Sequence, residues 1–140
     1  MLGFVIFVVN TLAAILLLGA CSAALQPSTQ SGPASPKKIG ERENGSTVAL
    51  QAGGELDITL DANATTGFRW EIAAADAAIA RPMGEPEYKP QGTALGSGGQ
   101  TTFRFEAVAP GQTIVKLIYH RPFEQGVPPA RTFQVNVVVK

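Results

Sequence analysis

Apolar and polar residues alternate with a period of two from about residue 45 to the end of the chain. Successive side chains of a β-strand point to opposite faces of the sheet, so this pattern predicts strands with one buried face and one face in water. Glycine, proline, asparagine and aspartate, which favour turns, separate the alternating segments. The predicted strands are 47–50, 55–61, 68–72, 102–107, 115–119 and 132–140.

The predicted fold is all-β, an immunoglobulin-like β-sandwich of about seven short strands. A chain of 140 residues is long enough for one domain with its own core, and short strands separated by turns are typical of such a sandwich. Only 72–80 is rich enough in alanine to favour a short helical turn, which Pro82 limits. The alternation assigns three side chains of one strand to the core: Phe68, Trp70 and Ile72.

An almost wholly apolar run covers 5–18, interrupted by Asn10 and Thr11. The run is short for a membrane span and fits the core of a signal peptide, although no Lys or Arg precedes it. It ends in Leu18-Gly19-Ala20-Cys21, which resembles the lipobox at which lipoprotein signal peptides are cut. Residues 1–20 are therefore expected to be a lipoprotein signal peptide, with the lipid on the Cys21 thiol. The alternative is a buried thiol in an uncleaved membrane helix.

Residues 21–44 are predicted to be a lipidated N-terminus and a flexible linker. This stretch contains three prolines among Ser, Thr, Gln and Gly, and too few large apolar residues to offset the entropy of ordering it. The folded domain is then expected to cover 45–140. A lipid anchor at Cys21 places the protein in a bacterial cell envelope, on the periplasmic or surface-exposed face of the outer membrane.

Composition and charge argue against several classes of function. The chain carries 11 Lys and Arg and 11 Asp and Glu residues, so its net charge is zero and no basic stripe favours nucleic acid as a partner. Cys21 is the only cysteine, which leaves no intrachain disulfide and no cysteine-based zinc site. His120 is the only histidine, and we expect it in a solvated loop, neither a metal ligand nor a catalytic base. The sequence thus predicts no cofactor, no metal and no catalytic residue, and a protein that is not an enzyme.

Three connections between the predicted strands have unusual compositions. Each alone has an ordinary explanation, because Asn, Thr and Gly favour an Asx-type turn and a glycine-rich loop is most often flexible. The glycine-rich loop is not a phosphate cradle, since no Lys-Ser/Thr follows it. The three loops contain Asn63-Ala64-Thr65-Thr66-Gly67-Phe68, Gly96-Ser97-Gly98-Gly99 and Arg121-Pro122-Phe123.

These motifs, in this order and spacing, resemble the chagasin family of protein inhibitors of papain-like cysteine proteases, over about 45–140. In that family an immunoglobulin-like sandwich presents the three loops side by side, and they enter the active-site cleft of the protease without being cleaved. The resemblance implies a reversible, competitive inhibitor that acts as a monomer on a papain-like cysteine protease. The alternative is a non-inhibitory envelope module that binds a protein partner through the same loops.

The resemblance also implies a role for each loop. The first would fill the centre of the cleft, the second would bring backbone close to one wall, and the third would pack on the other wall. Gly67 suits this role physically, since glycine accepts the positive φ that turns a chain away before a substrate-like strand forms. Ala64 stands where the family has Pro, and Phe123 stands where it has Trp. The predicted protease-binding residues are Asn63, Thr65, Thr66, Gly67, Phe68, Gly96, Gly98, Gly99, Arg121, Pro122 and Phe123.

Overall fold

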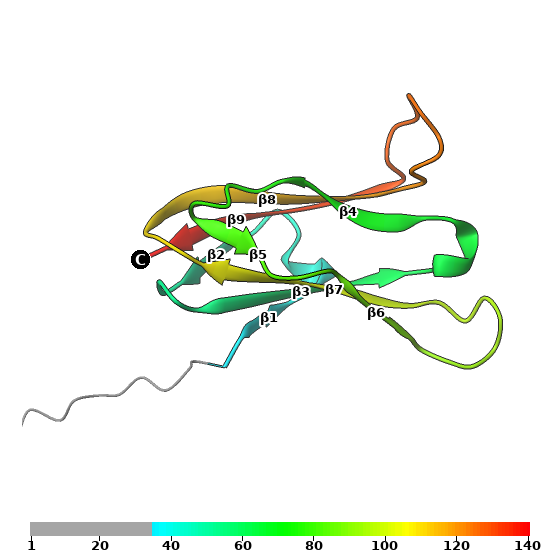
Figure 1. Ribbon diagram of the computed structural model, residues 1–140, viewed down its shortest axis with the longest axis horizontal. Coiled ribbons are helices and arrows are strands. Elements are labelled where there is room, and N and C mark those ends of the chain that lie inside the picture. Colours follow the sequence, from blue (N-terminus) through cyan, green and yellow to red (C-terminus); the bar gives the residue numbers. More distant parts are fainter. Residues whose placement is uncertain (1–34) are drawn as a thin grey trace, which may run out of the picture. The chain divides into compact units, whose positions relative to one another are not determined.

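The computed structural model describes residues 35–140, which form nine β-strands and two short 3-10 helices but no α-helix. The predicted signal peptide, Cys21 and most of the predicted linker lie outside the described residues. The strands form two sheets, which pack face to face (Figure 1). The prediction of an all-β sandwich is confirmed, with nine strands in place of about seven. Within the described part, no helix has the length and hydrophobicity needed to span a bilayer.

One sheet has five strands and the other has four. In the first the order is β1-β3-β7-β5, and β6 also pairs with β7. In the second the order is β2-β9-β8-β4, so β4 is an edge strand. The first sheet contains β1 (Lys37–Ile39), β3 (Glu55–Ala62), β5 (Ala80–Pro82), β6 (Glu87–Pro90) and β7 (Gly99–Ala107). The second contains β2 (Thr47–Leu50), β4 (Arg69–Ala74), β8 (Gly111–His120) and β9 (Arg131–Val139).

The core lies between the two sheets and is made by the predicted buried faces of the strands. Alternate residues of each long strand point inward, as a period of two requires. Burying one such side chain fully contributes about 1.5–3 kcal/mol before conformational entropy is subtracted. Trp70 of β4 is also buried, as predicted. The largest fully buried side chains are Phe105, Phe133, Leu56, Ile58, Leu60, Leu117, Val115, Val135 and Val137.

The folded domain begins before residue 45, so the predicted boundary of the linker is wrong. Strand β1 lies within the predicted linker, pairs in parallel with β3 and buries Ile39 to 8% exposure. A 3-10 helix, Glu41–Glu43, follows it, and the Gly40 backbone N–H donates a hydrogen bond to the Glu43 carboxylate at 2.7 Å. This segment has a single large apolar residue, so no alternating pattern marks it. Pairing with β3, which is distant in sequence, makes it a strand.

The chain around the end of β4 differs from the prediction at Ile72 and has a turn after it. Ile72 is 38% exposed, not buried, because β4 is an edge strand and its register with β8 shifts between Ile72 and Ala74. Within 72–80, where a short helical turn is predicted, β4 continues to Ala74 and a single turn follows at 77–79. Asp76 holds that turn through its backbone carbonyl and its side chain, which accept hydrogen bonds from three following backbone N–H groups.

Candidate functional site

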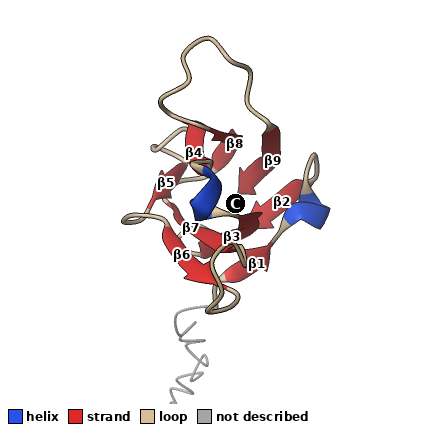
Figure 2. Cartoon of the chain, turned by 90° about the vertical axis from the view of Figure 1, so that its right-hand side faces the viewer, coloured by secondary structure: helices blue, strands red, loops and turns tan. Residues whose placement is uncertain are grey.

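Three loops lie side by side at one end of the sandwich (Figures 1 and 2). Loop 1 is 63–68 between β3 and β4, loop 2 is 91–98 between β6 and β7, and loop 3 is 121–130 between β8 and β9. Both views place loop 1 between the other two. The fold therefore gathers at one end three motifs that are far apart in the sequence.

Loop 1 is a capped turn with a small tip. The Asn63 side chain accepts hydrogen bonds from the backbone N–H of Thr65 at 3.2 Å and from its hydroxyl at 2.6 Å. The Thr66 hydroxyl donates to the Asn63 carbonyl at 2.7 Å. These bonds close the 3-10 helix Ala64–Thr66, which Gly67 ends with a φ of 76° that glycine adopts without strain. Both threonines and Gly67 are exposed, so the loop presents a hydrogen-bonded tip of small residues.

Tyr119 holds the base of loop 1 on the sandwich. Its hydroxyl accepts a hydrogen bond from the backbone N–H of Asn63 at 2.9 Å, while its ring is buried. Phe68 is half-buried against the core and stacks on Tyr119, with ring centroids 5.2 Å apart. In the free protein Phe68 therefore packs between loop 1 and the core, and it helps to hold loop 1 in place. Tyr119 ends the predicted strand 115–119, whose alternation places it at the edge of the core, but its bond to loop 1 depends on the fold.

Arg121 connects loop 3 to loop 1. Its Nε donates to the carbonyl of Thr66 at 3.1 Å, and its guanidinium lies 4.4 Å from the centroid of the Phe68 ring. Its Nη1 also pairs with Glu124 at 3.0 Å. Because these contacts join residues of loops 1 and 3, Arg121 holds the two loops in position relative to one another. They also occupy much of its guanidinium. The outward surface of loop 3 then comes from the residues that follow, of which Pro122 is exposed.

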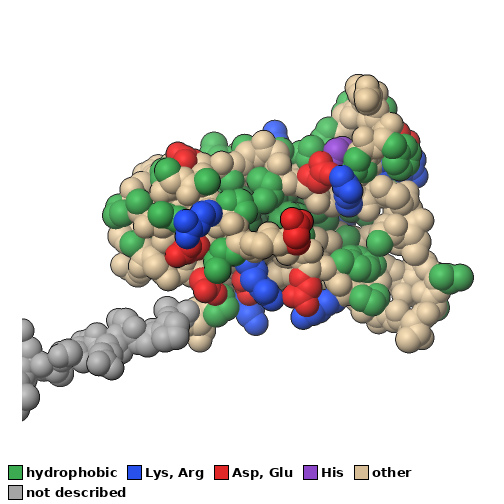
Figure 3. All heavy atoms as spheres, viewed as in Figure 1, with side chains coloured by type: hydrophobic (Ala, Val, Ile, Leu, Met, Phe, Trp, Pro, Cys, Tyr) green, Lys and Arg blue, Asp and Glu red, His purple; other side chains and the backbone are tan. Residues whose placement is uncertain are grey.

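The tips of loops 2 and 3 expose large apolar side chains, which stand out at this end of the domain in Figure 3. Phe123 is 71% exposed, and a Cβ added to Gly67 would lie 3.2 Å from its ring. Leu95, at the tip of loop 2, is fully exposed. The sequence analysis did not identify Leu95 as a site residue, because Leu95 lies outside the three motifs and has no alternating apolar neighbours. Several exposed apolar side chains on one face are typical of a binding surface.

The glycines of loop 2 serve different purposes. Gly96 and Gly98 have φ values of 83° and 70°, in the left-handed region that favours glycine. The Gly96 carbonyl accepts a hydrogen bond from the Asn63 side-chain amide at 3.4 Å, which joins loop 2 to loop 1. Gly99 is buried at the start of β7, and a Cβ there would lie 2.7 Å from the Tyr88 ring. In the free protein Gly99 therefore allows β6 to pack on β7 and is not presented outward.

His120 does not lie in a solvated loop, so that prediction is wrong. It ends β8, its side chain is 23% exposed, and its Nε2 lies 2.8 Å from a carboxylate oxygen of Glu71 on β4. Arg69 pairs with the other oxygen of Glu71 at 2.5 Å. The hydrogen bond with His120 lowers the pKa of Glu71 below its usual value, although partial burial acts in the opposite direction. Within 35–140 no group of three His, Cys, Asp or Glu residues is placed to hold a metal ion.

Comparison with known proteins assigns the chain to a family. A model of the Chagasin family peptidase inhibitor I42 matches residues 49–137. Chagasin from Trypanosoma cruzi is 29% identical over 90 residues, which cover 61% of this chain and 82% of chagasin.

Solved structures share the fold. The cysteine protease inhibitor EhICP2 from Entamoeba histolytica aligns with a TM-score of 0.64 at 24% identity, over 74% of this chain and 94% of that one. PbICP-C, solved in complex with falcipain-2, aligns with a TM-score of 0.54 at 21% identity, over 74% of this chain and 99% of that one. Together with the match over 49–137, the sandwich and its three loops lead to one assignment: the chain belongs to the chagasin family of peptidase inhibitors.

Proposed function

We propose that the protein is a reversible, competitive inhibitor of papain-like cysteine proteases, and that loops 1, 2 and 3 enter the active-site cleft together. The observation that carries the proposal is the set of bonds between the loops. Asn63 bonds to loop 2 and Arg121 bonds to loop 1, so the three loops form one surface with loop 1 at its centre. Membership of a peptidase-inhibitor family supports the proposal, as does the complex of PbICP-C with falcipain-2.

The geometry of loop 1 explains how such an inhibitor resists cleavage. A protease cleaves a peptide whose scissile carbonyl lies in the correct place above its nucleophile. In loop 1 the chain forms a 3-10 turn over Ala64–Thr66 and then turns away at Gly67, so no extended segment lies across the cleft. Because hydrogen bonds already hold this turn in the free protein, little conformational entropy is lost when it binds.

The contacts of Arg121 within this chain support a positioning role for it. Its guanidinium positions loops 1 and 3, and we propose that Pro122 and Phe123 supply the contact with the cleft wall. On the other side, the exposed tip of loop 2 with Leu95 supplies the corresponding contact. Gly98 suits the backbone path of this loop, since its φ of 70° lies in the left-handed region that favours glycine.

Enzyme kinetics tests the proposed function. The purified full chain should inhibit papain-like proteases competitively, should remain intact after prolonged incubation, and should leave serine proteases of the trypsin type unaffected. The measurement is the inhibition constant together with mass spectrometry of the recovered chain. Cleavage between Ala64 and Gly67 in proportion to the enzyme, or no inhibition of several papain-like proteases, would favour a non-inhibitory binding module.

We also propose that the inhibitor is a monomer held in a bacterial envelope by a lipid on Cys21. The support is the apolar run that ends in Leu18-Gly19-Ala20-Cys21 and the lack of a second cysteine in the sequence. Cys21→Ala should leave an uncleaved precursor that takes up no labelled fatty acid in cells, whereas the wild-type chain is labelled. Labelling that persists in the variant would contradict the anchor at Cys21.

A further inference from the structure

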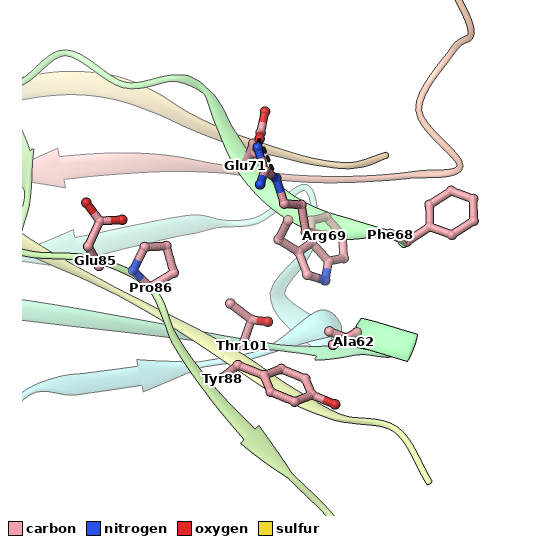
Figure 4. A pocket seen from close by; sticks show the side chains of 10 residues that line it. Ala62, Phe68, Arg69, Glu71, Glu85, Pro86, Tyr88 and Thr101 are labelled. Atoms are coloured by element: carbon pink, nitrogen blue, oxygen red, sulfur yellow. Dashed lines mark hydrogen bonds and ion pairs between the residues drawn. The ribbon is translucent and has the colours of Figure 1, made fainter. Parts of the chain in front are cut away.

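A groove of about 390 Å³ opens on one side of the sandwich, between β4 and β6 (Figure 4). Within the described residues no strand covers it, because β4 ends the four-stranded sheet and β6 pairs only with β7. Three aromatic residues, Phe68, Trp70 and Tyr88, form part of its wall together with Pro86, and Tyr88 is 37% exposed. Its volume falls within the range of about 300–1,000 Å³ that is usual for sites that enclose a ligand group.

The groove carries an excess of negative charge. One arginine and two glutamates line it, Arg69, Glu71 and Glu85, which gives a formal net charge of −1. Arg69 and Glu71 pair with one another, and His120 contacts the second oxygen of Glu71. Glu85 is exposed and forms no ion pair with any residue of 35–140. The groove therefore offers one uncommitted carboxylate, which lies beside Pro86 at one end of the groove (Figure 4).

The neighbouring aromatic rings already bind guanidinium groups of this chain. Arg121 lies 4.4 Å from the centroid of Phe68, and Arg131 lies 5.2 Å from that of Trp70. The quadrupole of an aromatic ring attracts a cation, and a nearby carboxylate adds a charge-assisted hydrogen bond. Tyr88 lines the groove and has no cationic partner among the described residues.

We propose that the groove receives a lysine or arginine side chain of the target protease, with its charged end at Glu85 and its stem along the groove beside Pro86. This proposal rests on the proposed inhibitory function. The groove is continuous with the loop surface, because Ala64 and Phe68 of loop 1 form part of its lining. A protease that covers loop 1 therefore reaches the mouth of the groove. Proteases with a basic side chain beside the cleft are the preferred targets.

Charge variants of the full chain test the groove against a matched control. Glu85→Gln should raise the inhibition constant about threefold to tenfold at low ionic strength, and the difference should vanish in ~1 M salt, where the Debye length is about 3 Å. Glu85→Lys should have a larger effect, because it places two cations together. Glu55 is the control, since it begins β3 at the end opposite loop 1 and forms no ion pair within 35–140. Glu55→Gln and Glu55→Lys change the net charge equally and should inhibit like the wild type.

A second measurement follows the environment of Trp70, which lies at the buried base of the groove and also packs on Tyr119, with ring centroids 5.1 Å apart. Trp70 is the only tryptophan of the chain and lines the groove, so 5-fluorotryptophan gives one fluorine resonance there. That resonance should move when a papain-like protease is added to the labelled chain. A wild type that inhibits, with Glu85 variants as potent as the Glu55 variants, overturns the groove and leaves the inhibitory function intact, whether or not the resonance moves. A wild type that inhibits no papain-like protease overturns the inhibitory function itself.

Discussion

Thr66→Trp is expected to abolish inhibition, with a loss of at least about a hundredfold, or ~2.8 kcal/mol of binding free energy. Thr66 is exposed at the tip of loop 1, which we propose lies closest to the nucleophile of the protease. An indole there would hold the backbone of loop 1 away from the cleft, and loops 2 and 3 would then lose their contacts as well. The inhibition constant against a papain-like protease measures this loss.

Thr66→Ala is the matched control for that variant. Both substitutions remove the hydrogen bond from the Thr66 hydroxyl to the Asn63 carbonyl, so both should lower the melting temperature by the same small amount. Only the tryptophan adds bulk, so only Thr66→Trp should lose inhibition. Potent inhibition by Thr66→Trp would mean that loop 1 does not occupy the cleft.

Phe123→Ala is expected to weaken inhibition by about thirtyfold or more. Truncating an aromatic anchor that becomes buried in an interface typically costs about 2 kcal/mol or more, and 1.4 kcal/mol corresponds to a factor of ten. At 71% exposure in the free protein, Phe123 contributes little to the core, so the melting temperature should barely change. Phe123→Trp should hold or improve inhibition, because it adds contact area and an N–H donor.

Ile114→Ala provides the comparison for Phe123→Ala. Ile114 is also an exposed apolar side chain, at 49%, but it lies within β8 and outside the three loops. Its removal should leave the inhibition constant unchanged. If Phe123→Ala instead lowers the melting temperature by several degrees and inhibits as the wild type does, Phe123 is a packing residue of loop 3 and not an anchor.

The bonds within and between the loops also bear on the two departures from the family motifs. Ala64 lacks the fixed φ of proline, but the Asn63 cap and the Tyr119 hydroxyl hold the ends of the turn. Phe123 lacks the indole N–H of tryptophan, and its ring lies against Gly67, where glycine leaves room for it. The surface is therefore preorganised by contacts within this chain, which lowers the entropic cost of binding.

The sequence identifies the loops of the candidate site, but it does not predict which of their residues are buried and which are presented outward. Asn63, Thr65, Thr66 and Gly67 favour a turn by their own chemistry, and the structure forms that turn. Gly99 lies in the same motif as Gly96 and Gly98, yet it is buried because β6 packs on it. Arg121 is predicted to contact the protease, but within this chain it pairs with Glu124 of its own loop and donates a hydrogen bond to Thr66, 55 residues earlier.

The sequence by itself determined the long strands and the core, because the alternation of apolar and polar side chains is a local property of each strand. It therefore placed the buried faces of β3, β7, β8 and β9 correctly. The tertiary structure alone decided which residues lie at sheet edges and which loops touch. Ile72 is exposed because β4 has no neighbour on one side, and Ile39 is buried because β1 pairs with β3. His120 meets Glu71 across 49 residues of chain, a contact set by strand register, which no local pattern in the sequence records.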